Sequence, residues 1–345
     1  MNIYEKDILS QPEDMSSALK SYRDQDYAGT MAELKKRSFA RIIFTGMGSS
    51  LCACYNTVTV LRNHGIHCFA VASSQLLHYE LASVTADTLV VMVSQSGRSG
   101  EIVELVNKLK GTCHILGISN DPQSPLGLGS NVMLNLYISP EQAVSTRTYL
   151  APMMLLRIFT EVFTDTWTEK SFAMIEAVIS ALNESIKNFE SMSAEIENFL
   201  RYPPFISLLG RGYSLSTVYA GALFIKEVAK YPSIAFDAGQ FRHGPYEMLG
   251  KDFSCFVFAP EDAGCDMQIR LAREIAGKGG KVVLVTDTAE TGGENILVIR
   301  QRYPNPELVD MVNVTPVQAF GNYTAKKKGL EVGKFLYSQK ITSIQ

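Results

Sequence analysis

Hydrophobic residues in the first half of the chain gather in short runs separated by stretches with helical spacing. The runs begin at residues 41, 67, 88, 114 and 132, and each has the length of a buried strand. Helix-like stretches, including 99–109, lie between them, and the segment 41–50 passes from an apolar run through Gly-x-Gly into small hydroxyl residues. Strands that alternate with helices are typical of parallel βαβ units. The pattern therefore predicts an α/β fold for this half.

The pattern becomes helical from Met153 to about Tyr202. Residues 171–200 carry Ile, Val, Leu and Phe at three- and four-residue spacing, with Glu and Lys between them. This spacing predicts one long connecting helix or two shorter ones. The pair at 203–204, Pro-Pro, ends the helical stretch, because a proline stops the helix that precedes it.

The second half of the chain repeats features of the first. The segments 46–51 and 210–215 share Gly, Gly, Ser and Leu at positions that differ by 164. Strand-like runs at 253–259 and 281–286, with a helical stretch between them, fall where the first half has two of its own runs. A regular offset of this kind indicates one α/β unit used twice.

The fold prediction is two tandem α/β lobes. Each lobe is expected to be a parallel sheet flanked by helices, as in a flavodoxin-like three-layer sandwich. A chain of 345 residues suits two domains. We predict the first lobe at 25–165, connecting helices at 166–202 and the second lobe at 203–345.

Composition excludes some classes of function without identifying one. Lys and Arg total 32 against 35 Asp and Glu, so the chain lacks the basic excess of a typical nucleic-acid binder. No apolar run reaches the ~18 residues of a membrane span, and the charged start MNIYEKDILS is unlike a signal peptide. We therefore expect a cytoplasmic protein with no nucleic-acid or membrane partner.

The six cysteines are expected to be reduced thiols packed in apolar surroundings. Most of them lie in or beside apolar runs, and free thiols fit a reducing compartment. The segment 52–54, Cys-Ala-Cys, is a close pair, but a zinc site needs about four ligands that usually arrive in spaced pairs. The sequence has no second such pair, so it predicts no metal site.

A serine-rich segment at 94–99, Ser-Gln-Ser-Gly-Arg-Ser, directly follows the predicted strand at 88–93. The carboxyl ends of parallel strands are where open α/β sheets bind ligands, and a helix N-terminus presents unpaired N–H groups to an anion. We therefore predict a phosphate site here. The alternative is a plain helix-capping loop, since serine is a common N-cap residue. The candidate ligand-binding side chains are Ser94, Gln95, Ser96 and Ser99.

Two other segments have a similar small, hydroxyl-rich character. The segment 46–50, Gly-Met-Gly-Ser-Ser, makes a strand-to-helix turn that alone explains its glycines, and Ser50 could supply a further donor to the anion. The segment 145–148, Ser-Thr-Arg-Thr, precedes a helix that is expected to begin near Leu150. Helix capping and ligand binding explain this second segment equally well.

Glu227 and His243 are the candidate acid–base residues. Glu227 lies on a predicted helix at 216–230, three and four residues after Phe224 and Leu223, and so shares their apolar face. A carboxylate in apolar surroundings can act as a general base near neutral pH. Histidine also exchanges protons near pH 7. The plainer interpretations are a surface glutamate at a helix end and an incidental loop histidine.

Together these motifs resemble the sugar isomerase (SIS) family over essentially the whole chain. The likeness is closest to the isomerase half of glutamine–fructose-6-phosphate aminotransferase and to the fructoselysine- and glucoselysine-6-phosphate deglycases. Glu227 and His243 are 16 residues apart, as are the catalytic Glu and His of these relatives. The motifs that carry the resemblance are Ser-Gln-Ser-Gly at 94–97, Ser-Thr-Arg at 145–147, Leu-Gly-Arg-Gly at 209–212, Lys-Glu at 226–227 and Ala-Gly-Gln-Phe-Arg-His-Gly-Pro at 238–245.

The resemblance implies a role for each candidate residue. Glu227 corresponds to the base that moves a proton between carbons 1 and 2 of the sugar. His243 corresponds to the residue that assists ring opening, commonly donated by the neighbouring subunit, which implies a homodimer or a dimer of dimers. Acid–base chemistry of this kind implies no cofactor and no metal. The residues implied to hold the sugar phosphate are Gly48, Ser49, Ser50, Ser94, Gln95, Ser96, Ser99, Ser145 and Lys340.

The sequence departs from the aminotransferase pattern at several places. It begins MNIY, where the aminotransferase has a glutaminase domain, so we expect no ammonia from glutamine by that route. Ala220 and Phe224 stand where the aminotransferase has Glu and Lys. Near the C-terminus, Gln339 occupies the aligned position of the Schiff-base lysine, and Lys340 lies one place later.

These departures favour the breakdown of an amino-sugar phosphate over its synthesis. We expect hydrolysis of an amino-acid–hexose 6-phosphate adduct, such as fructoselysine or glucoselysine 6-phosphate, to the free amino acid and a hexose 6-phosphate through an enaminol. Such an adduct already contains its nitrogen, so no enzyme lysine is required. The alternatives are an aldose–ketose phosphosugar isomerase, a glucosamine-6-phosphate deaminase and, in a different class, a sugar-phosphate sensor.

Overall fold

The computed structural model describes residues 1–141, 143–337 and 339–340. Contacts divide the chain into two units. The first lobe comprises Glu13–Ile175 and Leu336–Gln345, and the second lobe comprises Met1–Pro12 and Glu176–Phe335. The division falls near the start of helix α2 (Gln11–Asp24) and within helix α10 (Lys170–Lys187), so each lobe takes part of the region expected to connect them.

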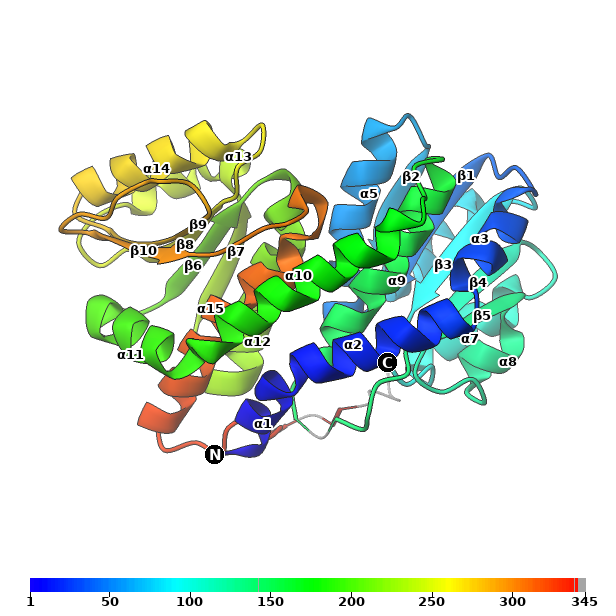
Figure 1. Cartoon of the computed structure of the whole chain (residues 1–345), viewed down its shortest axis with the longest axis horizontal. Helices are drawn as coiled ribbons and strands as arrows, with labels where there is room; N and C mark the ends of the chain where they lie inside the picture. Colours follow the sequence, from blue (N-terminus) through cyan, green and yellow to red (C-terminus); the bar gives the residue numbers. More distant parts are fainter. Residues whose placement is uncertain (142, 338, 341–345) are drawn as a thin grey trace. The chain divides into compact units, whose positions relative to one another are not determined.

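Five parallel strands form the sheet of the first lobe, as the apolar runs predict (Figure 1). In sheet order they are β2 (Cys68–Ala72), β1 (Arg41–Gly46), β3 (Thr88–Val93), β4 (His114–Ser119) and β5 (Val132–Asn135). Every residue of β3 is buried, which is expected of a parallel strand covered on both faces. β5 is shorter than its apolar run, and Tyr137 beyond its end has a φ of +51°.

Helices cover the sheet of the first lobe. They are α2 (Gln11–Asp24), α3 (Tyr27–Lys35), α4 (Ser49–Cys52), α5 (Cys54–Asn63), α6 (Ser73–Gln75), the π-helix η1 (Leu76–Glu80), the 3-10 helix η2 (Leu81–Ser83), α7 (Gly100–Leu109), α8 (Pro125–Gly129) and α9 (Arg147–Phe163). In α7, Ile102, Leu105 and Leu109 recur at helical spacing and pack in one buried cluster with Val90 and Met92 of β3. Each such side chain contributes roughly 1.5–3 kcal/mol by its burial.

The sheet of the second lobe repeats that of the first. Its parallel strands, in sheet order, are β10 (Ile296–Arg300), β9 (Lys281–Thr286), β8 (Ser254–Ala259), β6 (Ile206–Gly210) and β7 (Ser233–Asp237). Read from β7, this order matches the order of the first sheet read from β2. The sequence analysis does not identify β7 and β10, which lie at the two edges and are only partly buried.

The remaining helices belong to the second lobe. They are α1 (Ile3–Leu9), α11 (Phe189–Leu200), η3 (Gly212–Ser214), α12 (Leu215–Ala229), α13 (Ala238–Phe241), η4 (Pro245–Met248), α14 (Cys265–Gly277), η5 (Pro306–Leu308) and α15 (Asp310–Lys327). The helical pattern at 171–200 corresponds to α10 and α11, which are separated at Asn188. A core cluster that includes Phe241, Phe253 and Leu271 fills one side of this lobe.

Candidate functional site

The serine-rich segment leaves the central strand pair of the first lobe. β1 and β3 are parallel neighbours, with Gly46 paired to Val93 at their carboxyl ends. The chain runs from β1 to β2 on one side of this pair and reaches β3 on the other, so the strand order reverses here. Such a reversal is where open α/β sheets bind ligands. The segments 47–50 and 94–99 therefore leave the sheet at the edge where sheets of this topology bind ligands.

Hydroxyl groups within the segment 94–99 accept hydrogen bonds from its own main chain. The Oγ of Ser94 accepts from the N–H of Gly97 at 3.2 Å. The Oγ of Ser96 accepts from the N–H of Arg98, also at 3.2 Å. A hydroxyl that accepts in this way still has its own proton to donate. Both serines can therefore shape the loop and donate to an anion at the same time.

The chain that follows β4 fixes the middle of the loop. The carbonyl of Gln95 accepts from the N–H of Asn120 at 2.9 Å and from the Oγ of Ser119 at 3.1 Å. Gly97 has a φ of +62°, and a Cβ built on it would lie 2.1 Å from the Oγ of Ser124. Position 97 therefore excludes a side chain by backbone conformation and by space. The main chain of Gln95 thus holds the loop, and these contacts do not involve its side-chain amide.

Ser99 lies at the start of α7 and tests the capping alternative. It is the N-cap residue of this helix, yet its side chain makes no capping hydrogen bond. The N–H groups of the first helical turn have no partner within a helix, and the helix dipole favours an anion beside them. Helix capping by the side chain therefore does not explain why a serine stands at position 99. Ser99 is half-buried, so part of its surface is open to solvent.

Arg98 is directed to a protein carboxylate. Its Nη2 lies 2.7 Å from an oxygen of Asp121 in an exposed ion pair. The hydrogen bond from Arg98, together with one from the N–H of Gln123, holds the pKa of Asp121 below its usual value. The donors that the loop could offer to an anion besides Arg98 are therefore hydroxyls and N–H groups.

The neighbouring turn after β1 places three more candidate residues at the same edge. Gly48 precedes α4 with a φ of +54° and a ψ of −129°, a conformation that favours glycine. Ser49 and Ser50 begin this helix and are half-buried. The N–H of Ser50 closes the turn by donating to the carbonyl of Met47 at 3.1 Å. Both serines thus follow β1 at the same edge of the sheet from which the loop at 94–99 follows β3.

Glu141, which the sequence analysis does not single out, organises the turn that contains Ser145. Its side chain has no solvent exposure. One carboxylate oxygen accepts from the N–H and Oγ1 of Thr146 at 2.9 and 2.7 Å and from the N–H of Arg147 at 3.0 Å. The other oxygen accepts from the Oγ1 of Thr148 at 2.5 Å. Because Glu141 caps α9, the helix begins at Arg147, earlier than the predicted start near Leu150.

Lys340 reaches the same carboxylate from the C-terminal segment of the first lobe. Its Nζ lies 3.0 Å from an oxygen of Glu141 and donates to the carbonyl of Ala143 at 2.9 Å. The Lys340 side chain is 22% exposed. The structure therefore brings Lys340 beside the turn that carries Ser145, and the two are held through Glu141.

Glu227 lies near the C-terminal end of α12 in the second lobe and is half-buried. Leu223 and Phe224 were both expected to share the face of α12 that carries Glu227. Leu223 is half-buried like Glu227, whereas Phe224 is only 1% exposed and packs in the core. The ammonium of Lys230 donates to the carbonyl of Glu227 and, at 2.5 Å, to that of Lys334. Burial lowers the pKa of Lys230, and the nearby Glu227 opposes this effect.

His243 follows the short helix α13 and is exposed. The sequence analysis expected a loop here; a helical turn forms because Asp237 caps it. The Oδ1 of Asp237 accepts from the N–H groups of Gly239 at 2.7 Å and Gln240 at 3.2 Å. The N–H of His243 then donates to the carbonyl of Gln240 at 2.9 Å. The candidate residues thus divide by lobe, with the phosphate-binding set in the first and Glu227 and His243 in the second.

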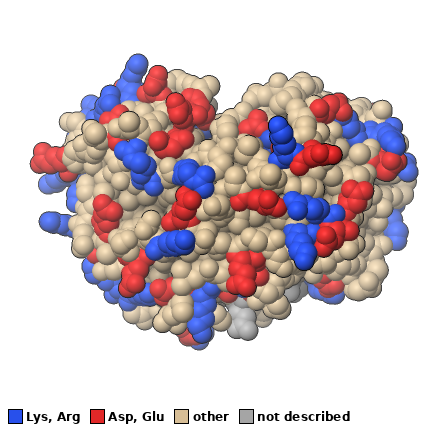
Figure 2. Space-filling model, viewed as in Figure 1, with Lys and Arg blue, Asp and Glu red and all other residues tan. Residues whose placement is uncertain are grey.

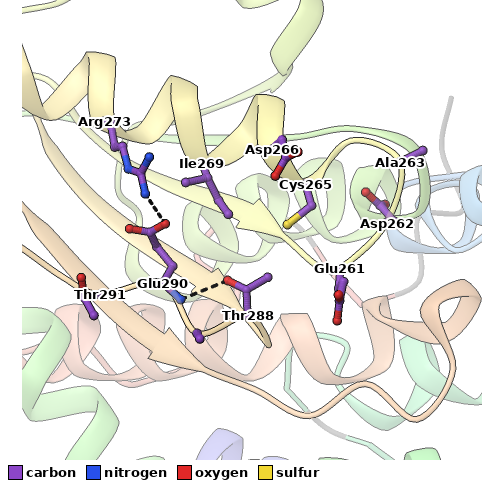
Figure 3. A pocket seen from close by; sticks show the side chains of 11 residues that line it. Glu261, Asp262, Ala263, Cys265, Asp266, Ile269, Arg273, Thr288, Glu290 and Thr291 are labelled. Atoms are coloured by element: carbon purple, nitrogen blue, oxygen red, sulfur yellow. Dashed lines mark hydrogen bonds and ion pairs between the residues drawn. The ribbon is translucent and has the colours of Figure 1, made fainter.

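The second lobe has a pocket of about 590 Å³ at the carboxyl ends of β8 and β9 (Figure 3). Glu261, Asp262 and Asp266 line it, and Arg273 in its wall pairs with Glu290. Burial raises the pKa of Asp262, and repulsion from a neighbouring aspartate adds to the effect. Carboxylates repel phosphate, so this pocket differs in charge from the edge that carries the serine loop.

The cysteines and the surface add little to the site. All six cysteines are buried, as their apolar surroundings predict. The described residues contain no cluster of His, Cys, Asp and Glu suited to a metal ion. Figure 2 shows acidic and basic side chains interspersed over the face in view. Across the described ranges, no helix combines the length and apolar character that a membrane span requires.

Solved structures resemble the whole chain in fold. The C-terminal domain of glucosamine-fructose-6-phosphate aminotransferase from Francisella tularensis has a TM-score of 0.86 at 22% identity and covers 97% of this chain and 98% of its own. The glucosamine-6-phosphate deaminase from Thermotoga maritima has a TM-score of 0.77 at 18% identity and covers 99% of both chains.

Sequence relatives show the same likeness over part of their length. The glutamine–fructose-6-phosphate aminotransferase of Aquifex aeolicus is 23% identical over 336 residues, which are 95% of this chain and 55% of the relative. The glutamine–fructose-6-phosphate aminotransferase of Bradyrhizobium diazoefficiens is 26% identical over 265 residues, which are 74% of this chain and 44% of the relative. This chain spans about half the length of these relatives. The SIS domain model matches residues 34–162 and 200–319, most of both lobes, and the chain therefore belongs to the SIS domain family.

Proposed function

We propose that this protein is a phosphosugar deglycase. Its substrate would be an amino-acid–hexose 6-phosphate adduct of the fructoselysine or glucoselysine 6-phosphate type, and its products a free amino acid and a hexose 6-phosphate. The observation that carries this proposal is the ion pair between Lys340 and Glu141, because it engages the C-terminal lysine with a buried protein carboxylate. The named relatives, an aminotransferase and a deaminase of hexose 6-phosphates, support a substrate that combines phosphate, sugar and nitrogen.

The sugar phosphate would bind at the β1–β3 edge of the first lobe. The donors there are hydroxyls, the Gln95 amide and the N–H groups at the start of α7, with the loop held rigid by its own hydrogen bonds. Rigid donors orient a ligand without first having to be ordered. Orientation of the reacting carbons is a major source of rate, because it removes the entropy cost of alignment from the chemical step.

Glu227 would then move a proton between carbons 1 and 2. In an adduct with its amine on carbon 1 and a carbonyl at carbon 2, the carboxylate takes a proton from carbon 1, the carbonyl oxygen gains a proton from solvent, and an enaminol forms. Return of the proton to carbon 2 leaves an imine between carbon 1 and the amine nitrogen. Water adds to that imine, the carbon–nitrogen bond breaks, and the amine leaves with a proton, which gives an aldose 6-phosphate. With the amine on carbon 2 the same steps give a ketose 6-phosphate.

This sequence of steps requires no amine from the enzyme. A lysine that forms a Schiff base must attack as a neutral amine, whereas Lys340 faces a buried carboxylate. On α12, the two positions that carry Glu and Lys in the aminotransferase pattern hold Ala220 and Phe224, which are 0% and 1% exposed. Neither position offers a second charged group beside Glu227. On α12, the departures from that pattern therefore replace two charged side chains with apolar ones.

His243 would assist ring opening from the neighbouring subunit of a homodimer. Its exposure supports this arrangement, because a residue that acts in another subunit must lie on the surface of its own. The capped turn of α13 gives it a defined position on that surface. Histidine suits the task, since it can donate a proton to the ring oxygen near neutral pH.

A substrate panel tests the proposed function. The full chain is incubated with fructoselysine 6-phosphate, glucoselysine 6-phosphate and other glycated amino-acid 6-phosphates, and the products are identified by mass spectrometry. Release of the amino acid with a hexose 6-phosphate is expected, and Glu227→Gln should abolish it. Absence of release from every member would overturn the proposal. Ammonia from glucosamine 6-phosphate would instead identify a deaminase, and interconversion of hexose 6-phosphates an isomerase.

Borohydride trapping tests the role of lysine directly. Reduction during turnover converts a protein–sugar imine into a stable amine, which adds the mass of the sugar phosphate to the protein. The proposed route places the imine on the substrate alone, so no protein adduct is expected. An adduct at Lys340 would show that the enzyme supplies the amine, and the proposed deglycase mechanism would be wrong.

A further inference from the structure

Glu141 has an unusual number of partners for one carboxylate. A carboxylate offers about four lone-pair positions. Here the two oxygens accept from five donors, of which four belong to Thr146, Arg147 and Thr148 and the fifth is the ammonium of Lys340. The side chain has no solvent exposure. Full satisfaction of both oxygens explains how a charge can be kept inside the lobe.

Capping of α9 accounts for only part of this arrangement. The bonds to the N–H groups of Thr146 and Arg147 involve a single oxygen, at 2.9 and 3.0 Å. The second oxygen serves the Thr148 hydroxyl and Lys340, which is 199 residues away in the sequence. A long-range ion pair of a buried carboxylate joins two segments that local structure does not connect.

The C-terminal segment, of which the structure describes Leu336, Tyr337, Gln339 and Lys340, depends on this contact. Leu336 and Tyr337 at its start are 53% and 100% exposed, so their side chains contribute little burial. Lys340 is the member of the segment whose side chain reaches inward, to Glu141 and to the Ala143 carbonyl. The ion pair is therefore the principal anchor of the described part of this segment on the first lobe.

We propose that Glu141 and Lys340 form a latch that holds the C-terminal segment against the turn at Ser145 and so sets the Ser145 hydroxyl for the substrate. The latch makes both residues positioning residues, and Lys340 acts through Glu141. The effect on catalysis rests on the proposed function, since it requires a phosphosugar at the first lobe. The attachment of the segment does not, and it can be measured separately.

Limited proteolysis measures the latch without any substrate. Chymotrypsin cleaves after aromatic residues, and Tyr337 is fully exposed immediately before the latch. Lys340→Met removes the charge and keeps the length of the side chain, and it should raise the rate of cleavage after Tyr337 about tenfold, because one half of the pair is lost. Lys340→Arg keeps the pair and should stay within about twofold of the parent. Equal cleavage of all three proteins would overturn the latch.

A matched control separates the latch from a general loss of lysine. Lys334 pairs with Glu331 at the surface, with both side chains more than half exposed. Lys334→Met therefore removes an equivalent charge near the same segment and should leave cleavage at the parent rate. Glu141→Gln should loosen the segment as Lys340→Met does. If that variant fails to fold, the lysine series still decides the question.

Measuring sugar phosphate affinity tests whether the latch influences ligand binding at the first lobe. Titration with glucose 6-phosphate and fructose 6-phosphate should give about tenfold weaker binding for Lys340→Met than for the parent, and Lys340→Arg should restore most of it. With a substrate found in the panel, Lys340→Met should raise KM more than it lowers kcat. A covalent lysine predicts the opposite, with normal sugar phosphate affinity and no turnover for either variant. If no adduct is turned over but proteolysis and affinity respond as expected, the latch stands and the deglycase proposal fails alone.

Discussion

The two lobes carry opposite chemistry at the same place in the fold. In the first, the connection from β3 to α7 is a loop of serines and glutamine whose hydroxyls lie at the sheet edge. In the second, the matching connection from β8 to α14 is Pro-Glu-Asp-Ala-Gly at 260–264, and its carboxylates line a pocket. The strand order around the two loops is the same. The fold thus supplies an edge and a helix start, and the loop sequence determines which charge can bind there.

The difference extends to the helices. The first lobe contains the whole set of residues predicted to hold the phosphate, whereas Glu227 lies on α12 of the second. Each of the two similar lobes therefore carries a different part of the candidate set, with the predicted phosphate-binding residues in the first and the predicted base in the second. Substitutions at matching positions of the two lobes therefore test whether the lobes differ in this way.

The largest effect is expected from Glu227→Gln. The amide keeps the shape of the side chain but cannot take a proton, so turnover of the substrate found in the panel should fall about 10²–10⁴-fold. Sugar phosphate affinity should be retained, because the residues predicted to hold the phosphate lie in the other lobe. Steady-state kinetics and a glucose 6-phosphate titration make the two measurements. Glu190→Gln, an exposed glutamate on α11, is the matched control and should leave both values unchanged.

Placing the acidic character of the second lobe in the first should give the next largest effect. Ser96→Asp replaces a donor with a charge that repels phosphate, and it should weaken glucose 6-phosphate binding about 100-fold, a loss of ~3 kcal/mol. The reciprocal change, Asp262→Ser, alters the acidic pocket and should leave that affinity at the parent value. Calorimetric titration compares the pair. Equal losses in the two variants would mean that the serine loop is not the phosphate site.

Much of this division could be read from the sequence. Five apolar runs gave the first sheet in full, and the helix expected at 99–109 is α7 at Gly100–Leu109. Buried parallel strands are apolar throughout, so their pattern is strong. The edge strands β7 and β10 were not identified from the sequence. In β7, Ser233 and Asp237 leave only three apolar residues in a row, whereas β10 begins with the apolar run Ile-Leu-Val-Ile at 296–299 and was missed although its pattern is present. The repeat at 46–51 and 210–215 correctly indicated two similar sheets.

The environment of the candidate site was less predictable. Glu141 lies five residues before Thr146, outside the spacing of known capping motifs, so no local rule assigns it to the start of α9. Its bond to Lys340 spans 199 residues, and only the folded chain brings such positions together. The side chain of Phe224 was expected to accompany Glu227, but helical spacing alone does not say which neighbour faces the core. Long-range contacts of individual side chains are what a periodic pattern leaves undetermined.

The rigidity of the serine loop predicts a smaller effect on stability. Gly97→Ala meets a φ of +62° and a contact of 2.1 Å with the Ser124 hydroxyl, and it should lower the free energy of unfolding by about 2 kcal/mol. Gly264 closes the matching loop of the second lobe with a φ of −97°, and its added Cβ would lie 3.3 Å from Asp262. Gly264→Ala should therefore cost less than ~0.5 kcal/mol. Urea unfolding of the two variants gives the comparison, and similar losses would remove the distinction between the loops.

The smallest effect concerns the acidic pocket itself. Burial, with repulsion from Asp287, raises the pKa of Asp262, so the folded state binds its proton more tightly than the unfolded state does. Protonated Asp262 therefore favours the folded state at low pH. This contribution to the free energy of unfolding is lost as pH rises from the ordinary carboxyl pKa through the raised pKa of Asp262. At pH 7 the ionised Asp262 therefore costs stability. Asp262→Asn removes that cost, and its Oδ1 can still accept the hydrogen bond from the Gly264 N–H, which is 2.7 Å long in the parent.

Thermal unfolding across pH measures this cost. Asp262→Asn should raise Tm at pH 7 by no more than about 2 °C, and the gain should disappear near pH 3, where both proteins are neutral at this position. Asp121→Asn in the first lobe should behave in the opposite way, because the hydrogen bond from Arg98 lowers the pKa of Asp121 and its stabilising ion pair is present only above the ordinary carboxyl value. If both variants changed Tm at pH 7 in the same direction, the loops of the two lobes would not differ in whether they stabilise a negative charge.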